Sequence, residues 1–254
     1  MQNTIQKSMT LSIKLSLLVT TALLTELTVP FASAAPFGGD VQVVNTLVDD
    51  TDSNNSLLSL REAIEAANAE PGPGLIRFGD GLNGTIVLTN GELLITDDLT
   101  IQGPNTNRLS ISGNLTSRIF HVAVSTNVHL SGLTLKNGVS DGTAADFPGF
   151  GGAILNLGDL SLERVNLSHN QATGDAEVDI QVNDWAIYAG SGGGGAIANF
   201  GRLQADLCDF FDNLAQGADD TIRTIPGFPF EPFGIGLAVG GAIYNDNGMG
   251  VGER

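Results

Sequence analysis

The chain has 254 residues, 42% of them hydrophobic and only 15% charged, and its 28 acidic against 11 basic residues give a net charge of −17 at pH 7. This apolar content excludes a disordered chain, and the negative charge excludes nucleic acid and anionic membrane surfaces as favourable partners. The 33 glycines, against 9 prolines, indicate many tight turns between apolar segments.

The N-terminus has the pattern of a Sec-type signal peptide. Two lysines precede an apolar stretch at 15–31, and Ala32-Ser33-Ala34 supplies the small residues of a cleavage site. Glu26 and Pro30 interrupt the apolar stretch, which disfavours a membrane span. We therefore expect residues 1–34 to be removed, leaving a secreted or outer-surface protein with no transmembrane segment. A retained membrane anchor is the alternative that the same pattern leaves open.

The next segment predicts a strand at 41–48 and then one amphipathic helix. Ser59 and Glu62 have the spacing of a capping box. Leu60, Ala63, Ile64 and Ala67 would share one face of the helix, and the Pro-Gly-Pro-Gly sequence at 71–74 would end it. Such a helix can cover the first coil of a repeat protein, whose strand edges would otherwise invite aggregation.

An internal repeat dominates the rest of the chain. Gly-Gly-Ala-Ile occurs at 151–154, 194–197 and 240–243, and each copy precedes an asparagine: Asn156, Asn199 or Asn245. After the first two copies, apolar residues follow at a spacing of two, three and two: Leu160, Leu162, Val165 and Leu167, then Leu203, Ala205, Cys208 and Phe210. Two earlier segments have the same spacing: Val128, Leu130, Leu133 and Leu135, and more weakly Leu94, Thr96, Leu99 and Ile101.

No helical period explains this spacing, whereas two short strands joined by a bend do. Stacked copies would bury a continuous core, so the sequence predicts an all-β parallel β-helix with about twenty residues per coil. The glycines suit corners that need positive φ or close approach of the next coil. The repeated asparagines suit either a stacked amide ladder or a left-handed corner.

Three insertions, at 138–150, 173–193 and 217–239, interrupt the repeats at the same point of the coil. They should therefore emerge side by side from one edge, which often marks a binding face in repeat proteins. The insertions carry acidic and aromatic residues that suit either a carbohydrate-binding ledge or packing against the solenoid: Asp175, Glu177, Asp179, Asp184, Trp185, Tyr188, Asp219, Asp220 and the segment 225–233.

Residues 58–64, Leu-Ser-Leu-Arg-Glu-Ala-Ile, together with Ile-Thr-Asp-Asp-Leu-Thr-Ile-Gln-Gly-Pro at 95–104, resemble the CSLREA domain of secreted bacterial proteins. The Gly-Gly-Ala-Ile repeats resemble those of the same proteins and of polymorphic outer-membrane proteins. Leu58 stands where the family motif has cysteine. The resemblance implies a right-handed, pectin-lyase-like β-helix with a capping segment at 35–110 and repeats at 111–254. It also implies export and surface or adhesin-like roles, but no defined reaction.

The search for chemistry yields no predicted catalytic residue. Glu163, Asp206 and Asp209 would lie on one outward face, where stacked carboxylates need solvent or a cation such as calcium, so these three are calcium candidates. His121, His129 and His169 lack a nucleophile at a motif spacing and favour structural roles. Cys208 is the only cysteine, so no internal disulfide is possible; we expect it to be a buried apolar side chain rather than a reactive thiol.

The leading interpretation is a non-enzymatic exported β-helix that presents its insertions to a carbohydrate or a cell-surface protein. A polysaccharide lyase or glycoside hydrolase of the same fold is the alternative, and an autotransporter-type passenger fragment is a third. The last repeat begins at Gly240 and the chain reaches Arg254 without a recognisable cap. Because solenoids need terminal caps, we expect the repeats to continue in a longer protein.

Overall fold

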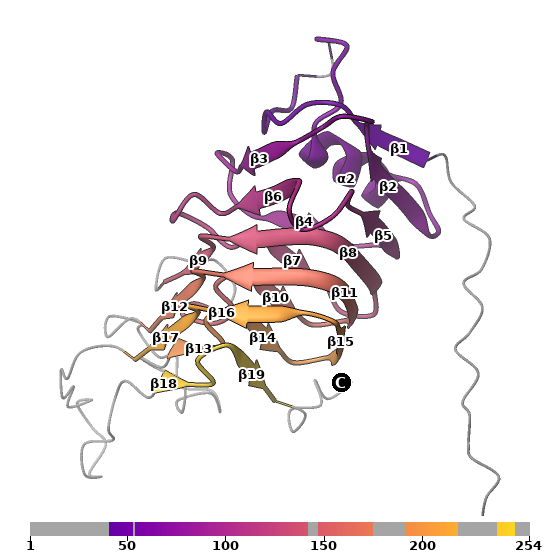
Figure 1. The fold of residues 1–254 in the computed structure, drawn as a ribbon. Coiled ribbons are helices and arrows are strands. Elements are labelled where there is room, and N and C mark those ends of the chain that lie inside the picture. Colours follow the sequence, from indigo (N-terminus) through magenta and orange to yellow (C-terminus); the bar gives the residue numbers. More distant parts are fainter. Residues whose placement is uncertain (1–40, 53, 142–146, 175–191, 218–237, 247–254) are drawn as a thin grey trace, which may run out of the picture. The chain divides into compact units, whose positions relative to one another are not determined.

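Every strand pair described by the computed structural model is parallel. The structure describes residues 41–52, 54–141, 147–174, 192–217 and 238–246 (Figure 1). All of them belong to one compact unit, Phe37–Arg254. The predicted signal peptide at 1–34 lies outside the described residues.

Successive passes of the chain each add one strand to several sheets (Figure 1). The largest, which we call sheet A, has the spatial order β1 (Val41–Val44), β2 (Gly74–Phe78), β5 (Leu99–Gln102), β8 (Asn127–Lys136), β11 (Asp159–Ser168) and β15 (Arg202–Asp206), and also contains β3 (Gly84–Val87), β6 (Leu109–Ser112) and β16 (Asp209–Phe211). Sheet B contains β4 (Leu93–Ile95), β7 (Phe120–Val122), β10 (Ile154–Asn156), β14 (Ile197–Asn199) and β19 (Ile243–Asn245). Sheet C contains β9 (Val139–Ser140), β12 (Gln171–Thr173) and β17 (Leu214–Gln216), and sheet D contains β13 (Gly192–Gly193) and β18 (Ala238–Val239). We call each pass a coil.

The two-three-two spacing marks the inward side chains of a bent strand. In β11 the four residues at this spacing are at most 2% exposed, and their register partners on β8 are equally buried. The residue at the bend has a positive φ in three successive coils: Gly132 (63°), Arg164 (52°) and Leu207 (54°). A left-handed residue reverses the alternation of side chains, so both halves of the strand keep their apolar residues inside. The predicted bend is confirmed.

The glycines of the repeated motif serve both predicted purposes. The first glycine of each copy has a positive φ: 67° at Gly151, 63° at Gly194 and 60° at Gly240. The second lies against the neighbouring coil, because a Cβ on Gly152 would stand 2.2 Å from the carbonyl oxygen of Gly195. A side chain at this position would therefore push two coils apart.

The asparagines of the motif form a ladder between coils. Asn156 Nδ2 donates to Asn199 Oδ1 at 2.5 Å, and Asn199 Nδ2 donates to Asn245 Oδ1 at 2.6 Å. None of the three has a positive φ, so the alternative of a left-handed corner is wrong. A second ladder, which the sequence analysis did not predict, joins Asn170 Nδ2 to Asn213 Oδ1 at 3.0 Å. Because Asn156, Asn170 and Asn199 are buried, the ladders satisfy polar groups inside the fold.

The predicted helix is α2 (Leu60–Ala69), and its capping box is present. Ser59 Oγ accepts from the backbone N–H of Glu62 at 3.1 Å, and Glu62 Oε2 accepts from the backbone N–H of Ser59 at 2.8 Å. Its apolar face is buried and joins the main core: Leu60, Ala63, Ile64 and Ala67. The helix therefore covers the N-terminal end of the core as predicted. Within the described ranges, no helix has the length and apolar character needed to cross a membrane.

Two expectations about the first coils are wrong in detail. The first strand ends at Val44 rather than Val48. In β4 the inward residues are Leu93 and Ile95, whereas Leu94 points outward and is 45% exposed. Leu99 and Ile101 do face inward, but they pair with Val128 and Leu130, the first half of the next coil's repeat. An irregular segment at 103–108 replaces the bend here, so the weak repeat could not be aligned by spacing alone.

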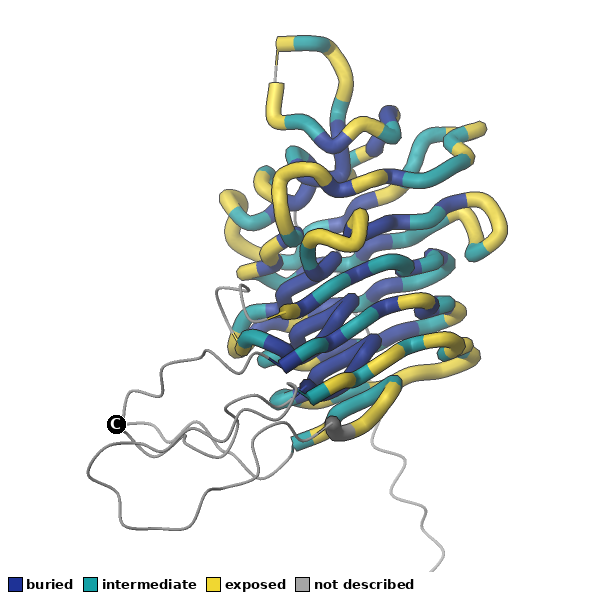
Figure 2. The backbone as a smooth tube through the Cα atoms, turned by 90° about the vertical axis from the view of Figure 1, so that its left-hand side faces the viewer, coloured by how far each residue is buried: buried dark blue, intermediate teal, exposed yellow. Residues whose placement is uncertain are grey.

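The last described coil, β15 to β17, is less buried than the coils above it (Figure 2). Leu203, Cys208 and Phe210 occupy inward positions and pack against the core, but each is only partly buried. The prediction that Cys208 is buried is therefore only partly right, because no described strand of sheet A covers it from the other side. Residues 247–254, on which the expected continuation of the repeats depends, lie outside the described residues.

Candidate functional site

The insertions have their roots side by side. They begin after β9, β12 and β17, which pair in register in sheet C, for example Val139 with Gln171 and Gln171 with Leu214. The predicted bounds 138–150, 173–193 and 217–239 were therefore too wide, because β9, β13 and β18 lie inside them. On the returning side, Phe150 bridges to Gly193, and β13 pairs with β18. We call this line of strand ends the insertion edge. Two stacks of hydrogen-bonded strands therefore fix the start and the return of successive insertions.

An aromatic cluster packs outside sheet B at the returning side of this edge. The ring centroids of Phe147 and Phe200 are 4.6 Å apart at an interplanar angle of 36°, and those of Phe150 and Tyr244 are 5.2 Å apart at 64°. The outward side chain of Leu155 is fully buried within this cluster. The rings are mutually tilted, which suits interlocked packing rather than a flat ledge for a sugar ring. This cluster packs the root of the first insertion against the outward face of sheet B.

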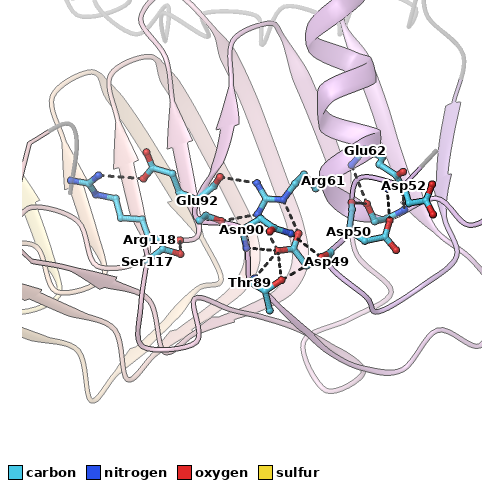
Figure 3. Close-up of polar contacts among 12 residues, drawn as sticks. Asp49, Asp50, Asp52, Arg61, Glu62, Thr89, Asn90, Glu92, Ser117 and Arg118 are labelled. Atoms are coloured by element: carbon cyan, nitrogen blue, oxygen red, sulfur yellow. Dashed lines mark hydrogen bonds and ion pairs between the residues drawn. The ribbon is translucent and has the colours of Figure 1, made fainter. Parts of the chain in front are cut away.

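Arg118 contacts the root of the first insertion, and Figure 3 shows its ion pair with Glu92. Its side chain is 1% exposed. Its Nε donates to the carbonyl oxygen of Phe150 at 2.9 Å, and Nη2 donates to that of Phe147 at 2.6 Å. Nη1 forms an ion pair with Glu92 at 3.2 Å, and the other oxygen of Glu92 lies 3.4 Å from Nδ1 of His121. These residues come from three coils, and the sequence analysis did not connect them.

The carboxylate of Glu92 is kept ionised by this cluster. Burial alone would raise its pKa, but the hydrogen bond from His121 and the charges of Arg118 and His121 outweigh burial and leave the pKa below its usual value. A carboxyl group of this kind is a poor general acid at neutral pH, because it has no proton to give. The cluster is therefore suited to holding the insertion edge in place.

The three calcium candidates lie on the outward face of sheet A. Glu163 and Asp206 are register partners on adjacent strands, as predicted, and Asp209 pairs with Asn166. Glu163 forms an ion pair with Arg164 at 2.5 Å, and Asp206 accepts a hydrogen bond from Gln204 at 2.7 Å. Among the described residues, no three His, Cys, Asp or Glu side chains lie close enough together to hold a metal ion. Calcium binding stays a prediction.

His129 belongs to this outward face as well. Its Nε2 lies 3.9 Å from Glu163 Oε2, and its Nδ1 lies 3.4 Å from Ser161 Oγ. The side chains of His129, Glu163 and Arg164 are 34%, 39% and 60% exposed. The face therefore brings together charged groups that the sequence analysis considered separately. The third histidine, His169, lies 3.6 Å from Asp212 one coil further on.

Cys208 has the properties of a packing residue rather than a nucleophile. Burial raises the pKa of its thiol, and the charges of Asp206 and Asp209 raise it further. A raised pKa lowers the fraction of reactive thiolate at neutral pH. The alternative of a reactive thiol is therefore disfavoured.

The carboxylates and aromatic residues predicted to line the insertions lie outside the described residues: Asp175, Glu177, Asp179, Asp184, Trp185, Tyr188, Asp219, Asp220 and 225–233. Comparison with family models, with curated proteins and with solved structures yields no match in any of the three. The resemblance to CSLREA proteins therefore stays a prediction from the motif residues.

Proposed function

We propose that this protein is an exported, right-handed, pectin-lyase-like β-helix of the CSLREA type that binds a carbohydrate or a cell-surface protein through its insertion edge and catalyses no reaction. The parallel sheets, the repeats and the capping helix support the fold assignment. The pattern of residues 1–34 supports export. An autotransporter-type passenger is compatible with the same fold and differs only in how it reaches the surface.

One observation carries the binding function. The roots of the insertions are held by registered strands, by the aromatic cluster and by Arg118, so segments far apart in the sequence begin and end beside one another. A rigid scaffold that positions variable segments is the usual way in which repeat proteins build a binding face.

A carbohydrate-active enzyme is the second candidate, because His129, Glu163 and Arg164 converge on sheet A with Asp206 beside them. Stacked carboxylates a few ångström apart resemble the pair that glycosidases need. The face is open, however, and Glu163 is already neutralised by Arg164. Charge stabilisation of a transition state is strongest in sites that exclude water, so this face favours binding or solubility over catalysis.

A polysaccharide and glycan screen separates the two functions, run with calcium and with chelator and scoring binding and product release together. Two variants sharpen it: removal of 176–190 with a short Gly-Ser link between β12 and β13, and the matched surface variant Glu163→Gln. We expect binding without product release, lost on removing the insertion and kept in Glu163→Gln. Release of sugar products that disappears in Glu163→Gln would overturn the proposal and establish the enzyme.

A further inference from the structure

Three asparagines among the described residues are followed by glycine: Asn83, Asn90 and Asn137. A fourth Asn-Gly pair, at 247–248, lies outside the described residues. An asparagine in this context can lose its side-chain amide without an enzyme, because glycine has no side chain to shield its backbone nitrogen. That nitrogen attacks the side-chain amide carbon of the asparagine, so the reaction needs a glycine N–H that is free and a backbone with room to move.

The hydrogen bonds of the three glycines separate one pair from the other two. The N–H of Gly84 donates to the carbonyl oxygen of Arg108 at 2.8 Å, at the point where β3 begins to pair with β6. The N–H of Gly138 donates to Asn170 Oδ1 at 2.8 Å, within the buried ladder. Among the described residues, no acceptor takes the N–H of Gly91. Attack at the first two glycines would require neighbouring coils to separate, whereas attack at Gly91 would not.

The space around the glycines separates the same pair. Asn90 and Gly91 are both exposed, and a Cβ built on Gly91 would meet no described atom within 4 Å. Gly138 is buried, and a Cβ there would stand 2.3 Å from the carbonyl oxygen of Gly152. The backbone of the pair at 90–91 therefore has the room that ring closure needs.

The side chain of Asn90 lies against the buried ion pair that holds α2 in place (Figure 3). Its Nδ2 donates to the carbonyl oxygen of Asp49 at 3.1 Å, and its backbone N–H donates to Asp49 Oδ2 at 3.1 Å. Asp49 in turn pairs with Arg61 of α2 at 2.8 Å. The bond from Nδ2 restrains the amide, but a single bond at an exposed residue slows its rearrangement by roughly tenfold at most.

We propose that Asn90 deamidates spontaneously in the folded protein and that the product loosens the attachment of α2 to the first coils. The nitrogen of Gly91 forms a bond to Cγ of Asn90, the bond from Cγ to Nδ2 breaks, and ammonia leaves. Water then opens the resulting succinimide ring at either carbonyl, which leaves an aspartate or an isoaspartate at position 90. Water is the one reactant consumed. The inference does not rest on the function proposed above.

Either product weakens the contacts of the buried ion pair. A carboxylate at position 90 has no hydrogen to donate to the carbonyl oxygen of Asp49, and it adds a like charge beside the Asp49 carboxylate. Isoaspartate also lengthens the main chain by one methylene group. That change displaces the carbonyl oxygens of Gly91 and Glu92, to which Arg61 donates at 2.7 and 3.1 Å. The modification therefore acts on the end of the fold that α2 covers.

Mass spectrometry of the aged protein tests the site. One sample of the full chain is incubated folded at neutral pH, and another is incubated unfolded in urea. Both are digested in heavy-oxygen water, which marks any deamidation during digestion, and fragment ions locate the mass gain. In the folded sample we expect Asn90 to react roughly tenfold or more faster than Asn83 and Asn137, because their glycine N–H groups are bonded between coils. In urea the three rates should become similar.

A matched pair of variants tests the consequence. Asn90→Asp imitates one product, whereas Asn83→Asp adds the same charge at an exposed side chain that has no hydrogen bond to a described residue. We expect Asn90→Asp to unfold at a lower urea concentration than the wild type and Asn83→Asp to be unchanged. Asn90→Gln keeps the amide but must close a larger ring, so ageing should leave its urea midpoint unchanged while that of the wild type falls.

Three outcomes would overturn the proposal. Deamidation of the folded chain that is no faster at Asn90 than at Asn83 and Asn137 would remove the site. Equal urea midpoints for Asn90→Asp and Asn83→Asp would remove the consequence. Loss of stability on ageing that is as fast in Asn90→Gln as in the wild type would assign the damage to another position.

Discussion

The two ends of the stack of described strands differ in how far their inward side chains are covered. At the N-terminal end α2 buries Leu60 and Ile64 over the first strands, and these side chains are at most 2% exposed. At the other end Leu203 and Phe210 occupy the same inward positions as Leu160 and Leu167 of the preceding coil, but they remain partly exposed. A repeat pattern thus specifies the path of a coil, whereas burial depends on what lies next to it.

The covered end also holds buried charge. Asp49 and Arg61 form an ion pair at 2.8 Å, with side chains 1% and 9% exposed. Asp49 Oδ2 accepts from the backbone N–H groups of Thr89 and Asn90, and Arg61 donates to the carbonyl oxygens of Gly91 and Glu92 (Figure 3). The pair therefore links the helix to the connecting segments at 45–52 and 88–92, and each nitrogen of the Arg61 guanidinium donates to an acceptor there.

Breaking the ion pair between Asp49 and Arg61 should give the largest loss of unfolding free energy. Arg61→Ala leaves the carboxylate of Asp49 buried without its cation, and such changes cost about 3–5 kcal/mol of unfolding free energy. Urea unfolding followed by far-UV circular dichroism measures it.

Arg202→Ala is the matched control at the uncovered end. Arg202 lies 3.8 Å from Asp159, and its side chain is 86% exposed, so its removal should cost less than about 1 kcal/mol. Equal losses of unfolding free energy in Arg61→Ala and Arg202→Ala would show that the buried ion pair stabilises the fold no more than the exposed one does.

Sequence reasoning succeeded where a feature is local or repeats. The capping box of α2 is contained within four residues, and the glycine and asparagine positions recur with the coil. The bends follow from the two-three-two spacing because a left-handed residue is the simplest way to change strand phase. The insertion roots follow from the repeat alignment. The ladder between Asn156 and Asn199 was one of two open alternatives, and its assignment needed the register of the coils.

The missed ion pairs join residues that follow no repeated spacing. Arg61 meets Asp49 across 12 positions, and Arg118 meets Glu92 across 26. Each of these side chains looks like an ordinary surface charge in the sequence. Only the stacking of irregular early coils, whose lengths follow no repeat, brings them together. The same irregularity explains why Leu94 was placed inside when it points outward.

A core substitution should show the second largest difference between a covered and an uncovered coil. Leu160→Ala removes a side chain that is 2% exposed and should cost about 2–5 kcal/mol of unfolding free energy. Its register partner on the last coil, Leu203, is already partly exposed, so Leu203→Ala should cost less than about 1.5 kcal/mol. The two variants are compared by urea unfolding under the same conditions. If Leu203→Ala is as costly as Leu160→Ala, the side chain of Leu203 is covered in solution as fully as that of Leu160.

The smallest change in unfolding free energy is expected at acid pH, and it comes from Asp49 at the covered end. Burial would raise the pKa of Asp49, but the hydrogen bonds from Arg61 and from the backbone of Thr89 and Asn90 outweigh it and leave the pKa below the usual aspartate value. A group whose pKa is lower in the folded state stabilises the fold above its unfolded pKa, near 3.9, and this contribution is lost as the pH falls through the folded pKa.

Glu92 acts in the same direction, so Asp49→Asn removes only part of the pH dependence of stability. The gap in unfolding free energy between the wild type and Asp49→Asn should therefore narrow below about pH 4, by no more than about 1.4 kcal/mol per pH unit, the slope for one proton. Urea unfolding at a series of pH values measures this gap. A gap that stays constant down to acid unfolding would mean that Asp49 stabilises the covered end through its shape and neutral hydrogen bonds rather than through its charge.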